Sequence, residues 1–178
     1  MKQQVKLAVF EIQVRGFSLK TFRVVCEQNN YGNGWTIILR RQDGSEDFYR
    51  NWNDYKNGFG DLEDELFMGL EKIHAITAAQ RQELLVLLED EDGEQSYERY
   101  DRFAIGDELE SFALHTLGNA NGTAGDSFKY HHGQKFTTYD RDNDSNQLKN
   151  CAKTRSAAWW YKSFCEVGTL QRSFRFFF

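Results

Sequence analysis

The 178-residue sequence contains no proline, no long apolar run and no excess of positive charge. Average usage near 5% would place about nine prolines in a chain of this length, so glycine, asparagine and aspartate must supply the turns. No run of about 18 apolar residues is present, which argues against a membrane-spanning helix. The formal net charge of −5 argues against a general affinity for nucleic acid or anionic membranes, both of which reward clustered Lys and Arg. We therefore expect a chain that neither spans a membrane nor has a general affinity for nucleic acid or anionic membranes.

Signals of cellular location are also few. The apolar run at the start extends only from Leu7 to Phe10 before Glu11 interrupts it, so no signal peptide is evident. Three cysteines form an odd count that leaves one thiol over. Two N-x-S/T sequons begin at Asn121 and Asn143, but such triplets often arise by chance. Location is not decided by these features.

Motifs for common catalytic chemistry are absent. The chain has no nucleophile elbow, zinc-binding H-E-x-x-H, Walker loop or dinucleotide fingerprint. His131 and His132 are adjacent and point in different directions on any regular element, so we expect them to pack or bond locally. One enzymatic alternative is a metal-dependent transferase, in which an Asp-x-Asp pair holds a divalent ion and a nucleotide diphosphate. Nothing nearby resembles a nucleotide pocket or a general base, so a non-enzymatic role is favoured.

The residues that are abundant favour one strand-rich domain. Hydrophobic residues make up 40% of the chain and aromatic residues 15%, enough for a sizeable core. Phe and Tyr suit strands and aromatic-lined sites better than long helices. Hydrophobic periodicity indicates a helix over 62–74. Period-two alternation and apolar runs predict strands over 10–14, 22–25, 35–39, 84–88, 97–103 and 112–117, the second and third joined by a hairpin-like turn.

The most informative segment reads FTTYDRDNDSNQLKNCAKTRSAAWWY. Its Asp140, Asp142 and Asp144 occupy alternate positions, a spacing that can direct several carboxylates at one hard cation, and calcium takes six to eight oxygen ligands from such loops. An EF-hand is excluded, because its sixth and twelfth positions need glycine and glutamate, where this chain has Ser145 and Cys151. A plain loop is the alternative, since Asp, Asn and Ser form turns readily. The local pattern leaves both interpretations open.

Several longer strings occur in an order that resembles the fibrinogen C-terminal domain. The similarity extends from Val9 to Cys165, and it is specific because many strings lie in register although each is weak alone. It resembles the version of the domain found in ficolins, tenascins, angiopoietins and arthropod immune lectins. The strings are GNGWTIILRRQDGSEDFYRNWNDYKNGFGDLEDELFMGLEKIHAIT, YERYDRFAIGDELESFALHTLG, AGDSFKYHHGQKFTTYDRDND and NCAKTRSAAWWYKSFC.

The resemblance implies an α+β fold with an amino-terminal disulfide region, a central mixed or antiparallel sheet, short helices and a loop-rich, calcium-binding carboxyl region. It implies an incomplete domain over 1–165 and a divergent tail over 166–178. The implied function is that of a secreted, extracellular, lectin-like recognition module that binds a glycan or a protein partner in innate immunity or adhesion. Oligomers would form through regions absent from this chain.

The resemblance also implies a calcium site. Carried over residue by residue, Asp142 and Asp144 are the carboxylate ligands. The backbone carbonyls of Asn146 and Leu148 complete the protein shell, and Asp140 supports the loop. Calcium is therefore the expected cofactor.

A disulfide between Cys151 and Cys165 is implied in the same way. It would close a ring of about 15 residues, worth on the order of 3 kcal/mol in the chain-entropy model. We expect the aromatic residues 159–161 inside this ring to pack in the core rather than to contact a ligand. Relatives have a cis peptide before the second cysteine, which predicts a cis bond between Phe164 and Cys165.

The ligand pocket of the family maps onto Arg155, Trp160, Cys165 and Glu166 in this chain. An Arg and a Glu cannot form the apolar floor that an acetyl methyl group needs. We therefore expect the chain not to bind acetylated sugars.

Other departures lie towards the two ends of the chain. Cys26 resembles the second member of an amino-terminal disulfide whose partner would lie upstream. After Cys165 the asparagine-leucine-asparagine-glycine turn of relatives is missing, and the terminal FRFFF is expected to be exposed and to favour self-association. These features are typical of a truncated or alternatively spliced product. The alternative function is a family member without ligand-binding activity.

Overall fold

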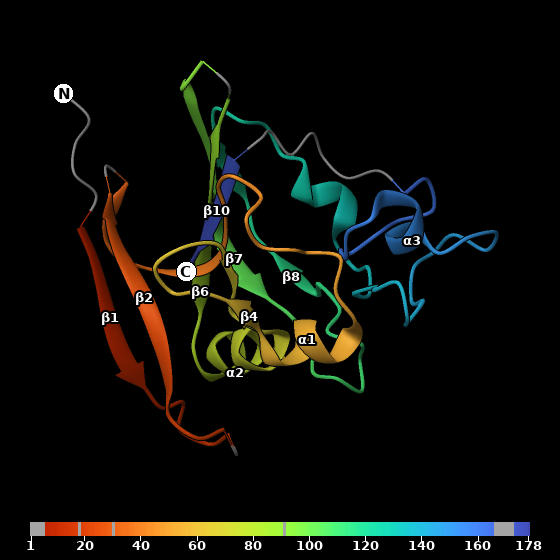
Figure 1. Ribbon diagram of the computed structural model, residues 1–178, viewed down its shortest axis with the longest axis horizontal. Coiled ribbons are helices and arrows are strands. Elements are labelled where there is room, and N and C mark those ends of the chain that lie inside the picture. Colours follow the sequence, from red (N-terminus) through yellow and green to blue (C-terminus); the bar gives the residue numbers. More distant parts are fainter. Residues whose placement is uncertain (1–5, 18, 30, 91, 166–172) are drawn as a thin grey trace.

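The computed structural model describes residues 6–17, 19–29, 31–90, 92–165 and 173–178. These residues form one large antiparallel sheet in which the main order is β1-β2-β3-β10-β6-β7-β8, with three short strands attached at its sides. Figure 1 shows β1 and β2 at one end of the long axis and the carboxyl-terminal loops at the other. The strands are β1 (Lys6–Ile12), β2 (Phe22–Asn29), β3 (Gly32–Arg41), β4 (Phe59–Gly60), β5 (Leu66–Phe67), β6 (Gln82–Glu89), β7 (Gln95–Ala104), β8 (Thr116–Leu117), β9 (Ala120–Gly122) and β10 (Ser173–Phe177).

The first strand lies earlier than predicted, because β1 ends at Ile12 and only residues 10–12 of the strand expected over 10–14 belong to it. β1 pairs antiparallel with β2, with Ala8 opposite Cys26, and β2 pairs antiparallel with β3, with Cys26 opposite Thr36. The strands predicted over 22–25 and 35–39 are confirmed as an antiparallel pair. The predicted turn over 31–34 is displaced, because β3 already begins at Gly32. The β-hairpin of β6 and β7 likewise confirms the strands predicted over 84–88 and 97–103.

The helix predicted over 62–74 begins later than expected. Residues 66–67 form β5, and α2 extends from Leu70 to Ala79. Gly69 precedes it with φ of 109°, and a Cβ there would lie 2.6 Å from the backbone of Asn57. The close approach of the backbone at Gly69 to the backbone at Asn57 therefore separates the strand from the helix. Hydrophobic spacing alone does not reveal this contact.

The other helices are short. Trp52–Asn57 forms α1, and the side chain of Asn51 caps it by accepting a hydrogen bond from the Asp54 backbone. Phe128–His131 forms a 3-10 turn, η1, and Cys151–Arg155 forms α3. The strand predicted over 112–117 is wrong for its first four residues, because only Thr116–Leu117 pairs. Phe112 has φ of 47°, outside the range of extended backbone.

The final strand lies in the middle of the sheet. β10 pairs antiparallel with β3 on one side and with β6 on the other. Phe176, Phe177 and Phe178 are 3%, 0% and 8% exposed. The expectation that the FRFFF end is exposed is therefore wrong, because two flanking strands satisfy its backbone groups and the core clusters on the two faces bury Phe176, Phe177 and Phe178. The sequence alone could not predict the central position of β10, because its partner strands are distant in the chain.

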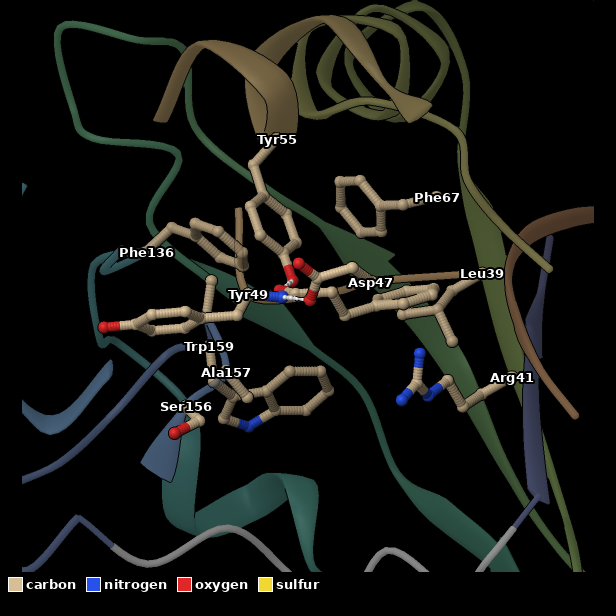
Figure 2. Close-up of a pocket in the computed structure, with 12 residues that line it drawn as sticks. Leu39, Arg41, Asp47, Tyr49, Tyr55, Phe67, Phe136, Ser156, Ala157 and Trp159 are labelled. Atoms are coloured by element: carbon tan, nitrogen blue, oxygen red, sulfur yellow. Dashed lines mark hydrogen bonds between the residues drawn. The ribbon is translucent and has the colours of Figure 1, made fainter. Parts of the chain in front are cut away.

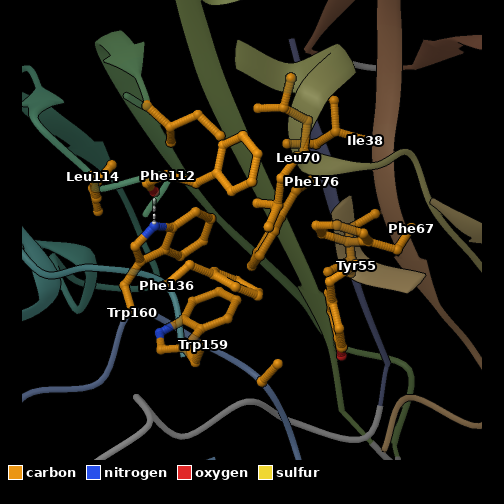
Figure 3. Packing of buried hydrophobic residues seen from close by; sticks show 14 of the residues in the cluster. Ile38, Tyr55, Phe67, Leu70, Phe112, Leu114, Phe136, Trp159, Trp160 and Phe176 are labelled. Carbon is orange, nitrogen blue, oxygen red and sulfur yellow. Dashed lines mark hydrogen bonds between the residues drawn. The ribbon is translucent and has the colours of Figure 1, made fainter. Parts of the chain in front are cut away.

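Aromatic residues dominate the core on the face of the sheet covered by α1, α2 and the carboxyl-terminal loops. Figure 3 shows Phe136 and Trp160 packed together, with Tyr55 and Phe67 beyond them. The ring centroids of Phe136 and Trp160 are 4.9 Å apart in an edge-to-face arrangement, a geometry favoured by the ring quadrupoles. A smaller cluster occupies the other face and contains Val25, Trp35, Ile37, Leu66, Leu85 and Phe177.

Candidate functional site

Asp140 anchors the start of the aspartate loop, defined here as residues 140–149. Its Oδ1 accepts a hydrogen bond of 2.9 Å from the backbone N–H of Trp52, at the start of α1. The same oxygen accepts a bond of 2.8 Å from the hydroxyl of Thr138. Through these contacts Asp140 holds the loop against the body of the domain.

Asp142 and Asp144 lie beside each other after this anchor. The backbone N–H of Asp144 donates to Oδ1 of Asp142 at 3.4 Å. The Asp144 carboxylate accepts hydrogen bonds of 2.8 Å from the backbone N–H groups of Asn146 and Cys151. Burial, together with the nearby charge of Asp144, raises the pKa of Asp142. The loop thus holds two like charges close together, an arrangement that a cation would relieve.

The oxygen chemistry of this loop fits a hard cation. A carboxylate has about four lone-pair positions, so Asp144 keeps acceptor capacity after its two N–H bonds. Among the described residues, no group of three or more His, Cys, Asp or Glu side chains is arranged to hold a metal ion. Any calcium here would therefore take Asp142, Asp144, backbone carbonyls and water, a mixture common for this ion.

The aspartate loop is joined to the disulfide ring, defined as residues 151–165. Cys151 and Cys165 form a disulfide with a Cα–Cα distance of 5.0 Å, which confirms the predicted pairing. The side-chain amide of Asn146 donates to the Ser163 carbonyl at 2.7 Å. Asn150 caps α3 at the start of the ring through the Lys153 backbone N–H. Loop and ring therefore form one braced unit.

The expected cis peptide before Cys165 is wrong. No cis peptide bond occurs among the described residues, and Cys165 instead adopts φ of 54°. Its backbone N–H donates to the Lys162 carbonyl at 2.9 Å, which closes a tight turn. The turn is formed by Ser163 and Phe164, and Cys165 follows it in a left-handed conformation.

The predicted pocket residues do not form an open apolar site. Trp160 is 4% exposed and its indole N–H donates to the Phe112 carbonyl at 2.8 Å. Arg155 is exposed, and its Nε donates to the Cys165 carbonyl at 2.7 Å. Trp159 and Tyr161 are buried as well, so the core role predicted for 159–161 is confirmed. Glu166 lies outside the described residues.

The histidines and Cys26 have local roles. His131 is buried and its Nδ1 lies 2.9 Å from the Trp160 carbonyl, whereas Nε2 of His132 lies 3.1 Å from the His115 carbonyl. Their predicted packing and local bonding are confirmed. Cys26 is not disulfide-bonded to any described residue, and its sulfur lies 3.6 Å from the hydroxyl of Thr36.

A hollow that sequence analysis missed lies between the segment 47–49 and the segment 156–159. Figure 2 shows aromatic rings around it, with the guanidinium of Arg41 on one side. Its volume is about 240 Å³. The lining residues are Leu39, Arg41, Asp47, Phe48, Tyr49, Tyr55, Phe67, Phe136, Ser156, Ala157, Ala158 and Trp159. They come from well-separated parts of the chain, so only the string of aromatics around Phe48 hints at the site in the sequence.

Contacts fix the walls of this hollow. The Tyr55 hydroxyl donates to the Phe48 carbonyl at 2.7 Å, and burial raises the Tyr55 pKa so that the phenol stays neutral. The Arg41 guanidinium lies 4.4 Å from the centre of the Phe48 ring. Tyr49 packs against Tyr139 with centroids 4.8 Å apart. The hollow therefore adjoins the segment that leads into the aspartate loop.

Comparison with known proteins identifies the family. A model of the "fibrinogen beta and gamma chains, C-terminal globular domain" matches residues 2–176. The chain is 43% identical to tenascin from Gallus gallus over 169 residues, which cover 95% of this chain and 9% of that protein. It is 44% identical to tenascin-R from Homo sapiens over 155 residues, which cover 87% of this chain and 11% of that protein. The chain belongs to the fibrinogen C-terminal domain family, and spans a small fraction of these relatives.

Solved structures agree with this assignment. The fibrinogen-like globe domain of human ANGPTL2 matches with a TM-score of 0.88 and 32% identity, over 97% of this chain and 91% of that one. A lamprey fibrin D-dimer, solved in complex with the peptide ligand Gly-His-Arg-Pro-amide, matches with a TM-score of 0.78 and 27% identity, over 89% of this chain and 64% of that one. The α+β fold with a mostly antiparallel sheet is confirmed.

Membership of this family settles the broad class of function. Its domains are non-enzymatic recognition and adhesion modules, so the transferase alternative is wrong. Homologues such as the tenascins are extracellular proteins. None of the helices in the described part of the chain is long and apolar enough to cross a bilayer.

Proposed function

We propose that this domain acts outside the cell by binding a glycan or a protein partner, and that its aspartate loop binds a structural calcium ion. Family membership and the aromatic hollow support the recognition role. The adjacent carboxylates of Asp142 and Asp144 support the calcium site.

The hollow of Figure 2 has the chemistry of a recognition site. Its volume of about 240 Å³ is small, suited to one sugar ring or one amino-acid side chain. An exposed aromatic face such as that of Tyr49 can pack against apolar C–H groups of either ligand. Among the described residues, the hydrogen bonds of the Arg41 side chain use Nη1, which leaves Nε and Nη2 as donors. Asp47 is exposed and adds a carboxylate acceptor.

Binding is best tested with defined probes. A printed glycan array and a set of short peptides, including Gly-His-Arg-Pro-amide, would be screened with the wild type and with Tyr49→Ser. We expect at least one glycan or peptide to bind the wild type and to lose about tenfold in affinity with Tyr49→Ser, since an aromatic contact of this kind contributes 1 kcal/mol or more. Leu109→Ser, at a 95% exposed position, is the control. Absence of binding to every probe contradicts the recognition role.

An acetylated-sugar resin tests the narrower expectation from sequence. Arg155 is occupied with the Cys165 carbonyl and offers no apolar floor. We expect the chain to pass through such a resin unretained. Retention that free acetate reverses would contradict this.

Calcium binding is tested by thermal unfolding in excess calcium and in chelator. A ligand that prefers the native state stabilises it by about 2.7 kcal/mol at 100 times its Kd, which shifts the midpoint by about 5 to 11 °C in a domain of this size. Asp142→Asn with Asp144→Asn should remove the shift, whereas the exposed Asp92→Asn should keep it. A double variant that keeps the full shift would place calcium elsewhere.

A further inference from the structure

Two large apolar side chains, one in the aspartate loop and one in the disulfide ring, project into solvent. Leu148 is 95% exposed and Phe164 is 74% exposed. Leu148 belongs to the aspartate loop, which extends at the end of the long axis opposite β1 and β2 (Figure 1). The function proposed above involves the backbone carbonyl of Leu148 but assigns no role to the side chain of either residue.

The two side chains come from segments that are tied together. The Asn146 side chain donates to the Ser163 carbonyl at 2.7 Å, so a residue two positions before Leu148 is tied to the residue before Phe164. The Cys151–Cys165 disulfide closes the same unit. Both apolar residues therefore belong to one braced scaffold, in which little backbone entropy is lost when they are buried.

Positive charge surrounds these two residues. The segment 145–165 contains Lys149, Lys153, Arg155 and Lys162 and no Asp or Glu, although the chain as a whole carries −5. The first three are exposed. At physiological ionic strength, charges more than about 8 Å away are largely screened. A surface that approaches this end meets the local positive charge rather than the net charge.

Asp142 and Asp144 are the nearest carboxylates before this segment, and they oppose an anionic surface. The Asp144 carboxylate is engaged with two backbone N–H groups. The positive charge of Lys153 acts on Asp142. Glu166 directly follows the segment, so four cations stand against three carboxylates and residues 142–166 carry a net charge of +1.

Exposed apolar side chains beside basic residues match a lipid surface better than they match a protein partner. Interfacial Leu and Phe side chains enter the boundary between headgroups and acyl chains, and each nearby Lys or Arg adds about 1 kcal/mol on an anionic leaflet. The centre of a protein interface is instead depleted of charge, whereas here Lys149 directly follows Leu148 and Lys162 lies two residues before Phe164. We propose that this end of the domain docks on anionic phospholipid membranes, with Leu148 and Phe164 inserted and Lys149, Lys153 and Lys162 at the headgroups.

Vesicle sedimentation tests the proposal with the full chain. The protein would be mixed with phosphatidylcholine vesicles or with vesicles that also contain phosphatidylserine, in chelator, so that no divalent cation bridges protein and lipid. We expect sedimentation only with phosphatidylserine, and weaker binding at high salt. Leu148→Ser with Phe164→Ser should weaken binding about tenfold or more. Lys149→Gln with Lys153→Gln should weaken it by about 10- to 30-fold.

Leu109→Ser is the matched control. Leu109 is also 95% exposed but lies on another loop, between Glu108 and Glu110, so its replacement should leave vesicle binding unchanged. Urea unfolding would check that each variant is folded. If the double variant of Leu148 and Phe164 does not fold, Leu148→Ser alone is tested in its place.

Three outcomes would overturn the proposal. The first is absence of binding to phosphatidylserine vesicles. The second is binding that depends on the lysines but not on Leu148 and Phe164, which would indicate a general polyanion site. The third is equal loss of binding with Leu109→Ser. If the chain captures a purified acidic protein but does not bind vesicles, the proposal is overturned as in the first outcome, and a protein interface is favoured instead.

Discussion

The backbone N–H of Trp52 donates a 2.9 Å hydrogen bond to the carboxylate of Asp140, 88 residues further along the chain. This bond satisfies one of the N–H groups that the start of a helix leaves without an internal partner. It also fixes the position at which the aspartate loop leaves the body of the domain. The first aspartate of the run is therefore structural, and the next two carry the proposed calcium chemistry.

Replacing Asp140 with Ala should destabilise the domain. The change removes an acceptor for both the Trp52 N–H and the Thr138 hydroxyl, and we expect a loss of about 1 to 3 kcal/mol in the free energy of unfolding. Urea denaturation would measure it. Asp92→Ala, an exposed position on the β6–β7 turn, should change stability by less than about 0.5 kcal/mol. Equal values for the two variants would show that the anchor contributes nothing.

Glu65 should make stability depend on pH. Its carboxylate accepts hydrogen bonds from the backbone N–H groups of Gln42, Asp43, Gly44 and Glu46. Burial alone would raise its pKa, but these bonds together lower it. Because the folded pKa lies below the unfolded value, the stabilisation is present above the ordinary glutamate pKa of about 4.3 and is lost as pH falls through the folded pKa.

The variant Glu65→Gln separates this effect from general acid denaturation. Its side chain cannot ionise, so the free energy of unfolding should be lower than that of the wild type near neutral pH and should fall less steeply in acid. Chemical denaturation at a series of pH values would measure both curves. Parallel curves for wild type and variant would show that Glu65 does not titrate in this way.

Removal of the disulfide should cost more than removal of the third cysteine. Cys151→Ser with Cys165→Ser opens the ring that braces the aspartate loop, and we expect a loss of about 3 kcal/mol. Cys26→Ser changes a thiol that forms no disulfide with described residues and should cost less than about 1 kcal/mol. Thermal and urea unfolding of the oxidised proteins would compare them. A Cys26 variant as damaged as the double variant would contradict this assignment.

Two Phe→Ala variants test the place of β10. Phe177 is fully buried in the smaller core cluster, so its replacement should cost about 3 to 5 kcal/mol. Phe164 is 74% exposed, and the same replacement there should be close to neutral. The comparison holds the chemistry constant and changes only burial. Similar costs at the two positions would mean that β10 does not occupy the centre of the sheet in solution.

The parts of the fold that sequence predicted are those with local signals. Short apolar runs on either side of a glycine-rich turn predicted the paired strands around Val24 and Ile37, and a longer apolar run predicted the strand around Val86. The likeness of NCAKTRSAAWWYKSFC to the family gave the Cys151–Cys165 bond. In each case the deciding information lies within a few residues, or in a string long enough to be specific.

The parts that were missed depend on contacts between distant segments. The start of α2 is set by how close Gly69 comes to Asn57, and β10 is recognisable as a strand only beside β3 and β6. The hollow of Figure 2 combines Arg41, Tyr49 and Trp159, which no local pattern connects.

The central position of β10 also determines when the sheet can be completed during synthesis. A ribosome completes β3 and β6 long before β10 emerges, so until then the growing chain exposes the two strand edges with which β10 later pairs. That interval is when a nascent chain of this kind would need a chaperone. Once β10 is in place, Thr36 and Phe178 exchange backbone hydrogen bonds of 2.8 and 2.9 Å. A purification tag joined directly to Phe178 would therefore begin at the heart of the sheet, and a flexible spacer would be needed to lead it out.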